Sequence, residues 1–213
     1  MIHTVRNLAL WAVMGAALAG CSGLASLTEV TRPVDNYVLT PKSTFDPGLP
    51  NLRFQIVVEQ PTATASVDTD QIAVQPNALQ VQYLPDARWV DRAPLIVQAL
   101  LIESFENSKR VPAVGSSTIG LRADFLIVTD IREFQAIVPQ DDPDAPLRVD
   151  VRLNIKLIDA FEDRIIASRS FEEVVPALSD APRDVVEAFD EALGDTMRDS
   201  VEWSIREIKR YAG

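Results

Sequence analysis

LRVDVRLNIKLI, residues 147–158, alternates apolar and polar side chains from its first residue to Leu157. Successive side chains of a strand point to opposite sides of the sheet, so this alternation predicts a strand with one buried and one wet face. The apolar positions are Val149, Val151, Leu153, Ile155 and Leu157, and the polar ones are Asp150, Arg152, Asn154 and Lys156. The segment therefore predicts a sheet with a core on one side.

Two further β-rich segments flank this strand. Residues 123–138 precede it and residues 164–175 follow it, and the connections at 141–146 and 162–163 are rich in Asp, Glu and Pro. Short polar connections between apolar runs indicate turns, so the three segments predict a meander. Residues 36–39 and 53–59 predict earlier strands.

Residues 72–74 and 79–83 predict a short hairpin around Gln75-Pro76-Asn77. Leu79, Val81 and Tyr83 alternate with glutamines, which predicts that these three side chains face the core.

Two helices are expected from spacings of three and four between apolar residues. The first covers residues 92–109, and the second runs from Pro182 to about Tyr211. Ser179 or Asp180 is expected to cap the second helix, and Lys209 and Arg210 suit its negative end. The fold class is therefore α+β: one domain, with a mainly antiparallel or mixed sheet and two helices packed on one face.

The N-terminus has the pattern of a lipoprotein signal peptide. Residues 1–20 combine Arg6 with an apolar run from Leu8 to Ala17, which is shorter than a bilayer span requires. Leu18-Ala19-Gly20-Cys21 matches the bacterial lipobox, so Cys21 is expected to carry a diacylglyceryl thioether and further acyl chains such as palmitate. The alternative is an ordinary secretory peptide with a chance cysteine. Residues 21–35 are small and polar with one proline, which suits a lipidated tether.

Maturation at Cys21 would remove much of the chain's reactive chemistry. The only histidine is His3, and the only cysteine is Cys21. A mature, lipidated chain would lack imidazole and free thiol, which excludes Cys–His and Ser–His–Asp catalysis and zinc sites built from His or Cys. The net charge is −11 for the full chain and, without Arg6, −11 − 1 = −12 after cleavage, which argues against nucleic-acid partners. No cofactor is expected.

The acidic and glycine-containing segments lack the patterns of known metal, phosphate and glycosidase sites. Residues 141–146 hold three aspartates but lack the glycine and distant glutamate of an EF-hand, so a solvated hairpin tip is favoured. Residues 115–120 lack the lysine of a P-loop and are expected to form a connection. Adjacent carboxylates such as Glu172-Glu173 and Asp190-Glu191 do not converge as a glycosidase pair would. We therefore expect no catalysis and no metal site.

Candidate contact residues are the aromatic and arginine side chains beside the helices. Trp89 and Trp203 each lie beside or within a predicted amphipathic helix, where a tryptophan more often packs in the core than lines a ligand site. Arg88 directly precedes Trp89. Protein contacts concentrate their energy in Trp, Tyr and Arg, so Arg88, Trp89 and Trp203 are the candidate interface residues.

The order of features resembles the ABC-type transport auxiliary lipoprotein component family. The resemblance rests on structural patterns spread over nearly all of the mature chain: Cys21, Tyr37-Val38-Leu39, the Tyr83 strand running into Arg88-Trp89, 123–127 with 131–134, 167–171, 186–189 and Trp203. It implies that residues 36–213 are a periplasmic auxiliary domain. The segment 141–146 departs from the pattern as a polar insertion.

The resemblance also implies partners. Members of this family work beside an ABC ATPase, a permease and an MCE-domain protein that move lipids or other hydrophobic compounds between the two envelope membranes. Self-association is expected too. Ser22 follows the lipobox cysteine where an aspartate would favour the inner membrane, so the outer membrane, facing the periplasm, is favoured over the periplasmic face of the inner membrane. The alternative is a lipoprotein of cell-wall assembly or a membrane-held, carboxylate-dependent hydrolase.

Overall fold

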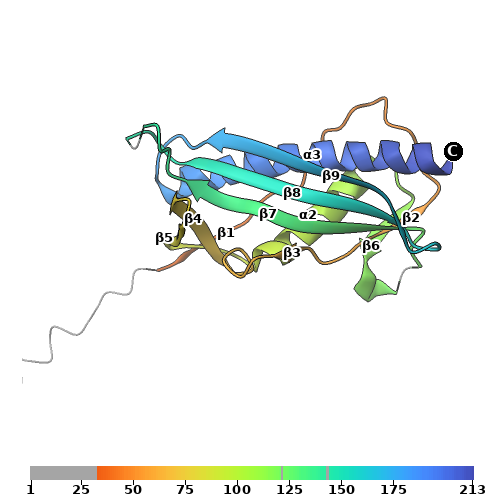
Figure 1. The fold of residues 1–213 in the computed structure, drawn as a ribbon, viewed down its shortest axis with the longest axis horizontal. Helices are drawn as coiled ribbons and strands as arrows, with labels where there is room; N and C mark the ends of the chain where they lie inside the picture. Colours follow the sequence, from red (N-terminus) through yellow and green to blue (C-terminus); the bar gives the residue numbers. More distant parts are fainter. Residues whose placement is uncertain (1–32, 121, 143) are drawn as a thin grey trace, which may run out of the picture. The chain divides into compact units, whose positions relative to one another are not determined.

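The three-stranded meander is the longest part of the sheet. The computed structural model describes residues 33–120, 122–142 and 144–213, and within them β7 (Phe125–Ile137), β8 (Arg148–Asp159) and β9 (Arg164–Pro176) run antiparallel along nearly their whole lengths (Figure 1). The alternating row of β8 points to the core as predicted, because its five apolar residues from Val149 to Leu157 are fully buried.

Strand β7 joins the meander to the rest of the sheet. On its other edge it pairs in parallel with three short strands in turn: β2 (Gln55–Val58), β3 (Thr62–Ala63) and β4 (Gln71–Asn77). Strand β6 (Ala113–Ser116) adds to β2 in parallel, and β5 (Gln80–Trp89) pairs antiparallel with β4. Strand β1 (Asp35–Tyr37) then pairs in parallel with the end of β5. The described strands form one mixed nine-stranded sheet.

The two helices of the described residues lie on the same side of this sheet (Figure 1). Helix α2 (Ala93–Ser108) has a proline in its first turn and ends at Lys109 in the left-handed conformation. Helix α3 (Pro182–Ala212) presents a continuous apolar stripe, from Val185 to Ile208, to β8 and β9. A single turn of 3₁₀ helix, η1 (Ser117–Ile119), follows β6. The predicted α+β class with two helices on one face is confirmed.

The segment between β1 and β2 connects the two helices. The Thr40 backbone N–H donates to Asp190 Oδ1 at 2.6 Å, and the Lys42 backbone N–H donates to Ser104 Oγ at 3.0 Å. Further along, the Asp46 N–H donates to Glu202 at 2.7 Å. Residues 40–46 therefore bond to α2 and α3 and tie both helices to the start of the domain.

The hairpin of β4 and β5 forms where it was predicted, but its expected orientation is wrong. Leu79 is 98% exposed and Val81 is 46% exposed, so neither faces the core. The first half of β5 extends beyond the part of the sheet that the helices cover. Its alternating residues therefore do not form one buried and one solvent-exposed face.

Two other local expectations are corrected. Ala181 is the N-cap of α3, without a side-chain cap, because Ser179 Oγ bonds to Asp184 and the Asp180 carboxylate accepts the Leu147 N–H at 2.9 Å. The segment 115–120 is more than a connection, since its first two residues belong to β6.

Candidate docking surfaces

Trp89 lies in the core. Its side chain is 2% exposed, and its ring meets Phe189 edge to face at 5.2 Å and Phe134 at 5.9 Å between centroids. These three rings join β5, β7 and α3. Trp89 therefore packs in the core, which was the alternative to an interface role. Its ring is not available on the surface of this structure.

Arg88 points the other way, as the alternation of β5 requires. Its guanidinium is half exposed and pairs with Asp70 at 3.1 Å. The structure therefore separates the adjacent candidates Arg88 and Trp89 onto opposite faces.

Trp203 borders a groove between α3 and β9. Its ring is partly buried and packs edge to face against Phe171 at 5.5 Å, and the guanidinium of Arg169 lies 5.0 Å from the Phe171 ring centroid. The groove encloses about 320 Å³ and is completed by Asp199, Glu202, Arg206 and Glu207. An aromatic floor thus lies within a charged rim, the arrangement typical of protein interfaces.

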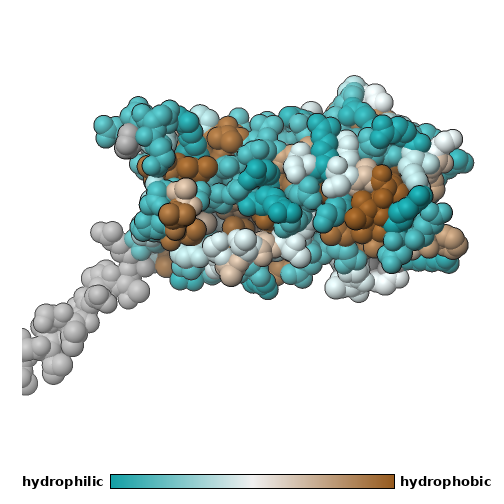
Figure 2. All heavy atoms as spheres, in the orientation of Figure 1, coloured by the Kyte–Doolittle hydropathy of each residue, from teal (hydrophilic) through white to brown (hydrophobic). Residues whose placement is uncertain are grey.

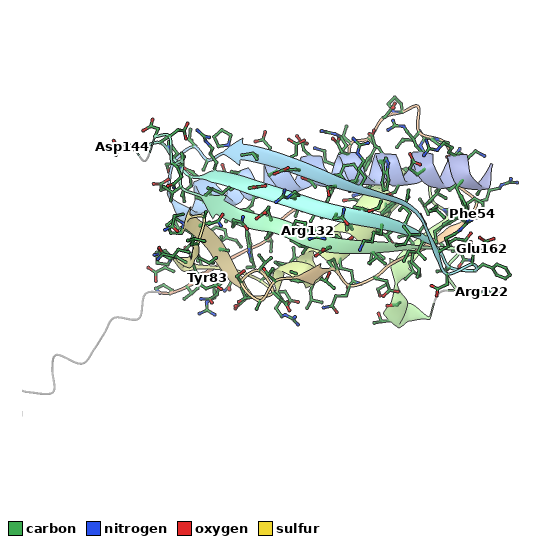
Figure 3. The ribbon with its side chains drawn as sticks, viewed as in Figure 1. Phe54, Tyr83, Arg122, Arg132, Asp144 and Glu162 are labelled. Atoms are coloured by element: carbon green, nitrogen blue, oxygen red, sulfur yellow. The ribbon has the colours of Figure 1, made fainter. Side chains whose placement is uncertain are left out.

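A second hollow lies at the turn between β8 and β9, and we call it the hairpin-end surface. Its aromatic residues are Phe54, Phe125, Phe161 and Tyr211, and its charged residues are Arg122, Asp124 and Asp159. It encloses about 320 Å³. Figure 3 shows Phe54, Arg122 and Glu162 together at this end of the sheet, with Tyr83 and Asp144 at the opposite end.

Hydrogen bonds hold the hairpin-end surface in one shape. Arg164 Nη2 donates to the Tyr211 hydroxyl at 2.7 Å, and that hydroxyl donates to Asp159 Oδ2 at 3.0 Å. The Glu162 and Phe161 backbone N–H groups donate to the other oxygen of Asp159, at 3.0 and 2.9 Å. These bonds, that of Glu162 first, lower the pKa of Asp159. The carboxylate therefore remains ionised and fixes the turn.

Phe161 is the most exposed aromatic side chain of this surface. It is 89% exposed, on a turn whose backbone is held by Asp159. Sequence reasoning missed it, because a phenylalanine between two predicted strands has no periodic neighbours. The available signal was its position: an aromatic residue within the short polar connection at 160–163.

The sheet face opposite the helices carries charge at its centre. Figure 2 shows this face, hydrophilic over the middle of β7 and β8, with hydrophobic patches nearer its ends. Glu133 pairs with Arg152 and also accepts Gln135 Nε2 at 2.5 Å. Asp150 beside them is 9% exposed, and its Oδ1 accepts no hydrogen bond from the protein. Burial, then Glu172 and Glu133, raise the pKa of Asp150 to about 6.

The described residues contain no cluster of three or more His, Cys, Asp or Glu side chains suited to a metal ion. No helix within 33–120, 122–142 and 144–213 is long and apolar enough to cross a bilayer. Cys21 and the tether up to residue 32 lie outside the described residues, so Cys21 lipidation remains a prediction. Arg88, Trp89 and Trp203 do not come together as one surface patch.

Comparisons with known proteins agree with this architecture. A crystal structure of protein XCC0632 from Xanthomonas campestris superposes with a TM-score of 0.78 at 25% identity, covering 84% of this chain and 98% of that one. A second crystal structure, of an uncharacterized protein, shares the fold with a TM-score of 0.56 at 16% identity, covering 79% of this chain and 99% of that one.

A relative from Bradyrhizobium diazoefficiens, the uncharacterized protein bll6063, is 28% identical over 187 residues. The match covers 86% of this chain and 49% of the relative, so the chain spans about half the length of that curated protein. The model of one protein family matches residues 37–199, from the end of β1 into the second half of α3. On that match, the chain belongs to the family of ABC-type transport auxiliary lipoprotein components.

Proposed function

We propose that this protein is a lipid-anchored periplasmic accessory component of an MCE/ABC-type system that transports lipids or other hydrophobic compounds between membranes. Family membership over residues 37–199 carries the proposal. The lipobox at Cys21 supports it, because several acyl chains on one residue are enough for stable anchoring. In this proposal residues 1–20 are removed, residues 21–35 form the tether, and the domain faces the periplasm from the outer membrane.

The protein acts in this system as an adaptor and not as an enzyme. Two of the charged groups have structural partners: Asp159 holds a turn, and Asp195 pairs with Lys42 at 2.6 Å. Asp150, whose Oδ1 accepts no hydrogen bond, lines neither of the two aromatic hollows. A general base or nucleophile would need a free group beside a substrate-sized hollow. Asp124, in the hollow of the hairpin-end surface, already accepts the Gln55 N–H at 2.7 Å.

The contact with the transport machinery is assigned to the hairpin-end surface. An 89%-exposed phenylalanine above a rigid hollow with Arg122 and Tyr211 has the composition of an interface centre, where aromatic and arginine side chains dominate the binding energy. The partner is a protein of the same system, foremost its MCE-domain component. Arg88 and Trp203 are secondary contact candidates.

Co-purification from the native host tests this function. Full-length protein carrying a C-terminal tag is expressed at its natural level, membranes are solubilised in mild detergent, and bound proteins are identified by mass spectrometry. We expect an ABC ATPase, a permease and an MCE-domain protein to be enriched. Enrichment of cell-wall enzymes in their place would overturn the proposal.

A further inference from the structure

We infer that β9 is a self-association edge: two copies of the chain join through antiparallel pairing of β9 about a two-fold axis at Phe171. Among the described residues, β9 pairs only with β8, so the other edge of this thirteen-residue strand is open. An open edge is a row of unpaired N–H and C=O groups that another strand can complete. This inference does not depend on the proposed function.

The charges of β9 are arranged for such a partner. Arg169 and Glu173 flank Phe171 at equal distance, and alternation places all three side chains on the helix side of the strand. Within the described part of the chain, neither Arg169 nor Glu173 forms an ion pair; Arg169 lies over the Phe171 ring at 5.0 Å. A basic and an acidic side chain thus lie at this edge without an ion-pair partner among the described residues.

Two-fold pairing supplies both missing partners. With Phe171 on the axis, Arg169 of each copy lies directly opposite Glu173 of the other, which gives two cross-strand ion pairs. Residues an even number of positions apart share a face, so both pairs lie on the helix side. Ala167 then faces Val175, an apolar pair, at each end of the same row.

Neighbouring registers do not pair Arg169 with Glu173 of the other copy. An axis at Glu172 would set two glutamates directly against each other, and an axis at Arg169 would do the same with two arginines, which is destabilising. An axis at Ser170 would leave Glu173 opposite Ala167. An axis at Ser168 would place Arg164 opposite Glu172, but Arg164 already pairs with Glu162 at 2.9 Å, and Glu173 would then face Asp163. The charge pattern therefore favours the register with Phe171 on the axis, with a second copy of this chain as the occupant.

The groove beside β9 fits the same arrangement. Phe171 is 6% exposed and Trp203 is partly buried against it at 5.5 Å, so the two copies would bring four aromatic rings together near the axis. The charged residues of the groove, among them Arg206 and Glu202, would surround this centre as a rim.

Charge reversal tests the pairing. Full-length protein is purified in detergent, and its mass is measured by sedimentation with the detergent matched in density. We expect a dimer for the unaltered chain. Arg169→Glu and Glu173→Arg should each weaken dimerisation by at least about tenfold, because each places two like-charge pairs across the edge. The double variant Arg169→Glu/Glu173→Arg restores both ion pairs with reversed sign and should restore the dimer.

Glu172→Arg is the matched control. It makes the same change of charge on the same strand, but on the opposite face, where Glu172 would face Ser170 of the partner subunit, so the dimer should persist. Near-ultraviolet circular dichroism confirms that each variant is folded. A monomeric unaltered chain, an assembly insensitive to both single reversals, or a folded double variant that stays monomeric would each overturn the inference.

Discussion

Lys42 and Asp195 lie 153 positions apart in the sequence, yet Lys42 Nζ lies 2.6 Å from Asp195 Oδ1. Arg198 contacts the same oxygen at 2.8 Å. The Lys42 side chain also passes Gly194, where an added Cβ would be in ordinary van der Waals contact with the Lys42 Cδ at 3.8 Å. This ion pair fastens the segment between β1 and β2 to the middle of α3.

Replacing Lys42 by methionine should lower the free energy of unfolding at pH 7 by about 1 kcal/mol, the usual size for a partly exposed pair. The hydrogen bond from Lys42, more than any other favourable contact, lowers the pKa of Asp195. The contribution is therefore present above the ordinary carboxyl pKa of 3.8 and is lost as pH falls through the lower folded value. Urea titrations at pH 7 and pH 3 should show that the free energy of unfolding falls less between these pH values for the variant than for the unaltered protein. Lys156→Met, on β8, serves as control and should change stability by less than about 0.5 kcal/mol.

Trp89→Ala should destabilise the domain by about 3–5 kcal/mol, because it leaves a cavity beside the Phe134 and Phe189 rings. The neighbouring Arg88→Ala should cost less than about 1 kcal/mol, since its pair with Asp70 is exposed. Chemical denaturation distinguishes the two. A Trp89→Ala variant as stable as the unaltered chain would mean that the ring is not packed as described.

Asp150→Asn should stabilise the fold at pH 7 by about 1–3 kcal/mol, because it removes a buried carboxylate with an unsatisfied oxygen. Burial raises the pKa of Asp150 to about 6. Asp150 should therefore contribute more to the free energy of unfolding at pH 4, where it is protonated, than at pH 7, where it is ionised. That contribution is full below about pH 4 and disappears as pH rises through 6. The melting temperature should change less with pH across this window for the variant than for the unaltered protein. An equal change for both proteins would contradict the assignment.

Phe161→Ala should leave the melting temperature within about 2 °C of the unaltered value, because the ring is 89% exposed. It should reduce recovery of the MCE-domain protein in the co-purification at least about fivefold, as loss of a central aromatic contact does. Leu178→Ala is the matched control, since Leu178 is 85% exposed and follows β9 at the opposite end of the strand. Equal loss with both variants would remove the hairpin-end surface from consideration.

Cys21→Ser should release or mislocalise the protein, because no other cysteine can form the thioether. Sucrose-gradient fractionation of the unaltered protein should place it with outer-membrane markers. Mass spectrometry provides the independent check: an unmodified mature N-terminus other than Cys21 would contradict the anchor.

The meander and both helices were predictable because their patterns are long. Residues 147–158 keep a period of two for a whole strand, and residues 182–211 keep the helical spacing for some eight turns. Strands β3 and β6 were not predicted, since two residues of β3 and the Gly-containing β6 carry no period. Their structure depends on pairing with β7 and β2, which are distant in sequence.

The candidate surfaces were harder to predict than the fold. Composition singled out Trp89 and Trp203 equally, and only the packing of Phe134 and Phe189 around Trp89 distinguishes them. Arg169 and Glu173 are of interest because β9 is an edge strand. No local pattern reveals this, because whether a strand is central or at an edge depends on the whole topology.

The central position of β7 has a consequence for the order in which the chain can fold. β2, β3 and β4 share no pairing with one another, and each reaches the common sheet through β7. The polypeptide is made from its N-terminus, so these strands exist before the segment that unites them. Until Ile137 has emerged, the first half of the domain has open edges and no shared layer. During synthesis and export, this half of the domain would therefore expose strand edges that can aggregate until β7 is available to pair with them.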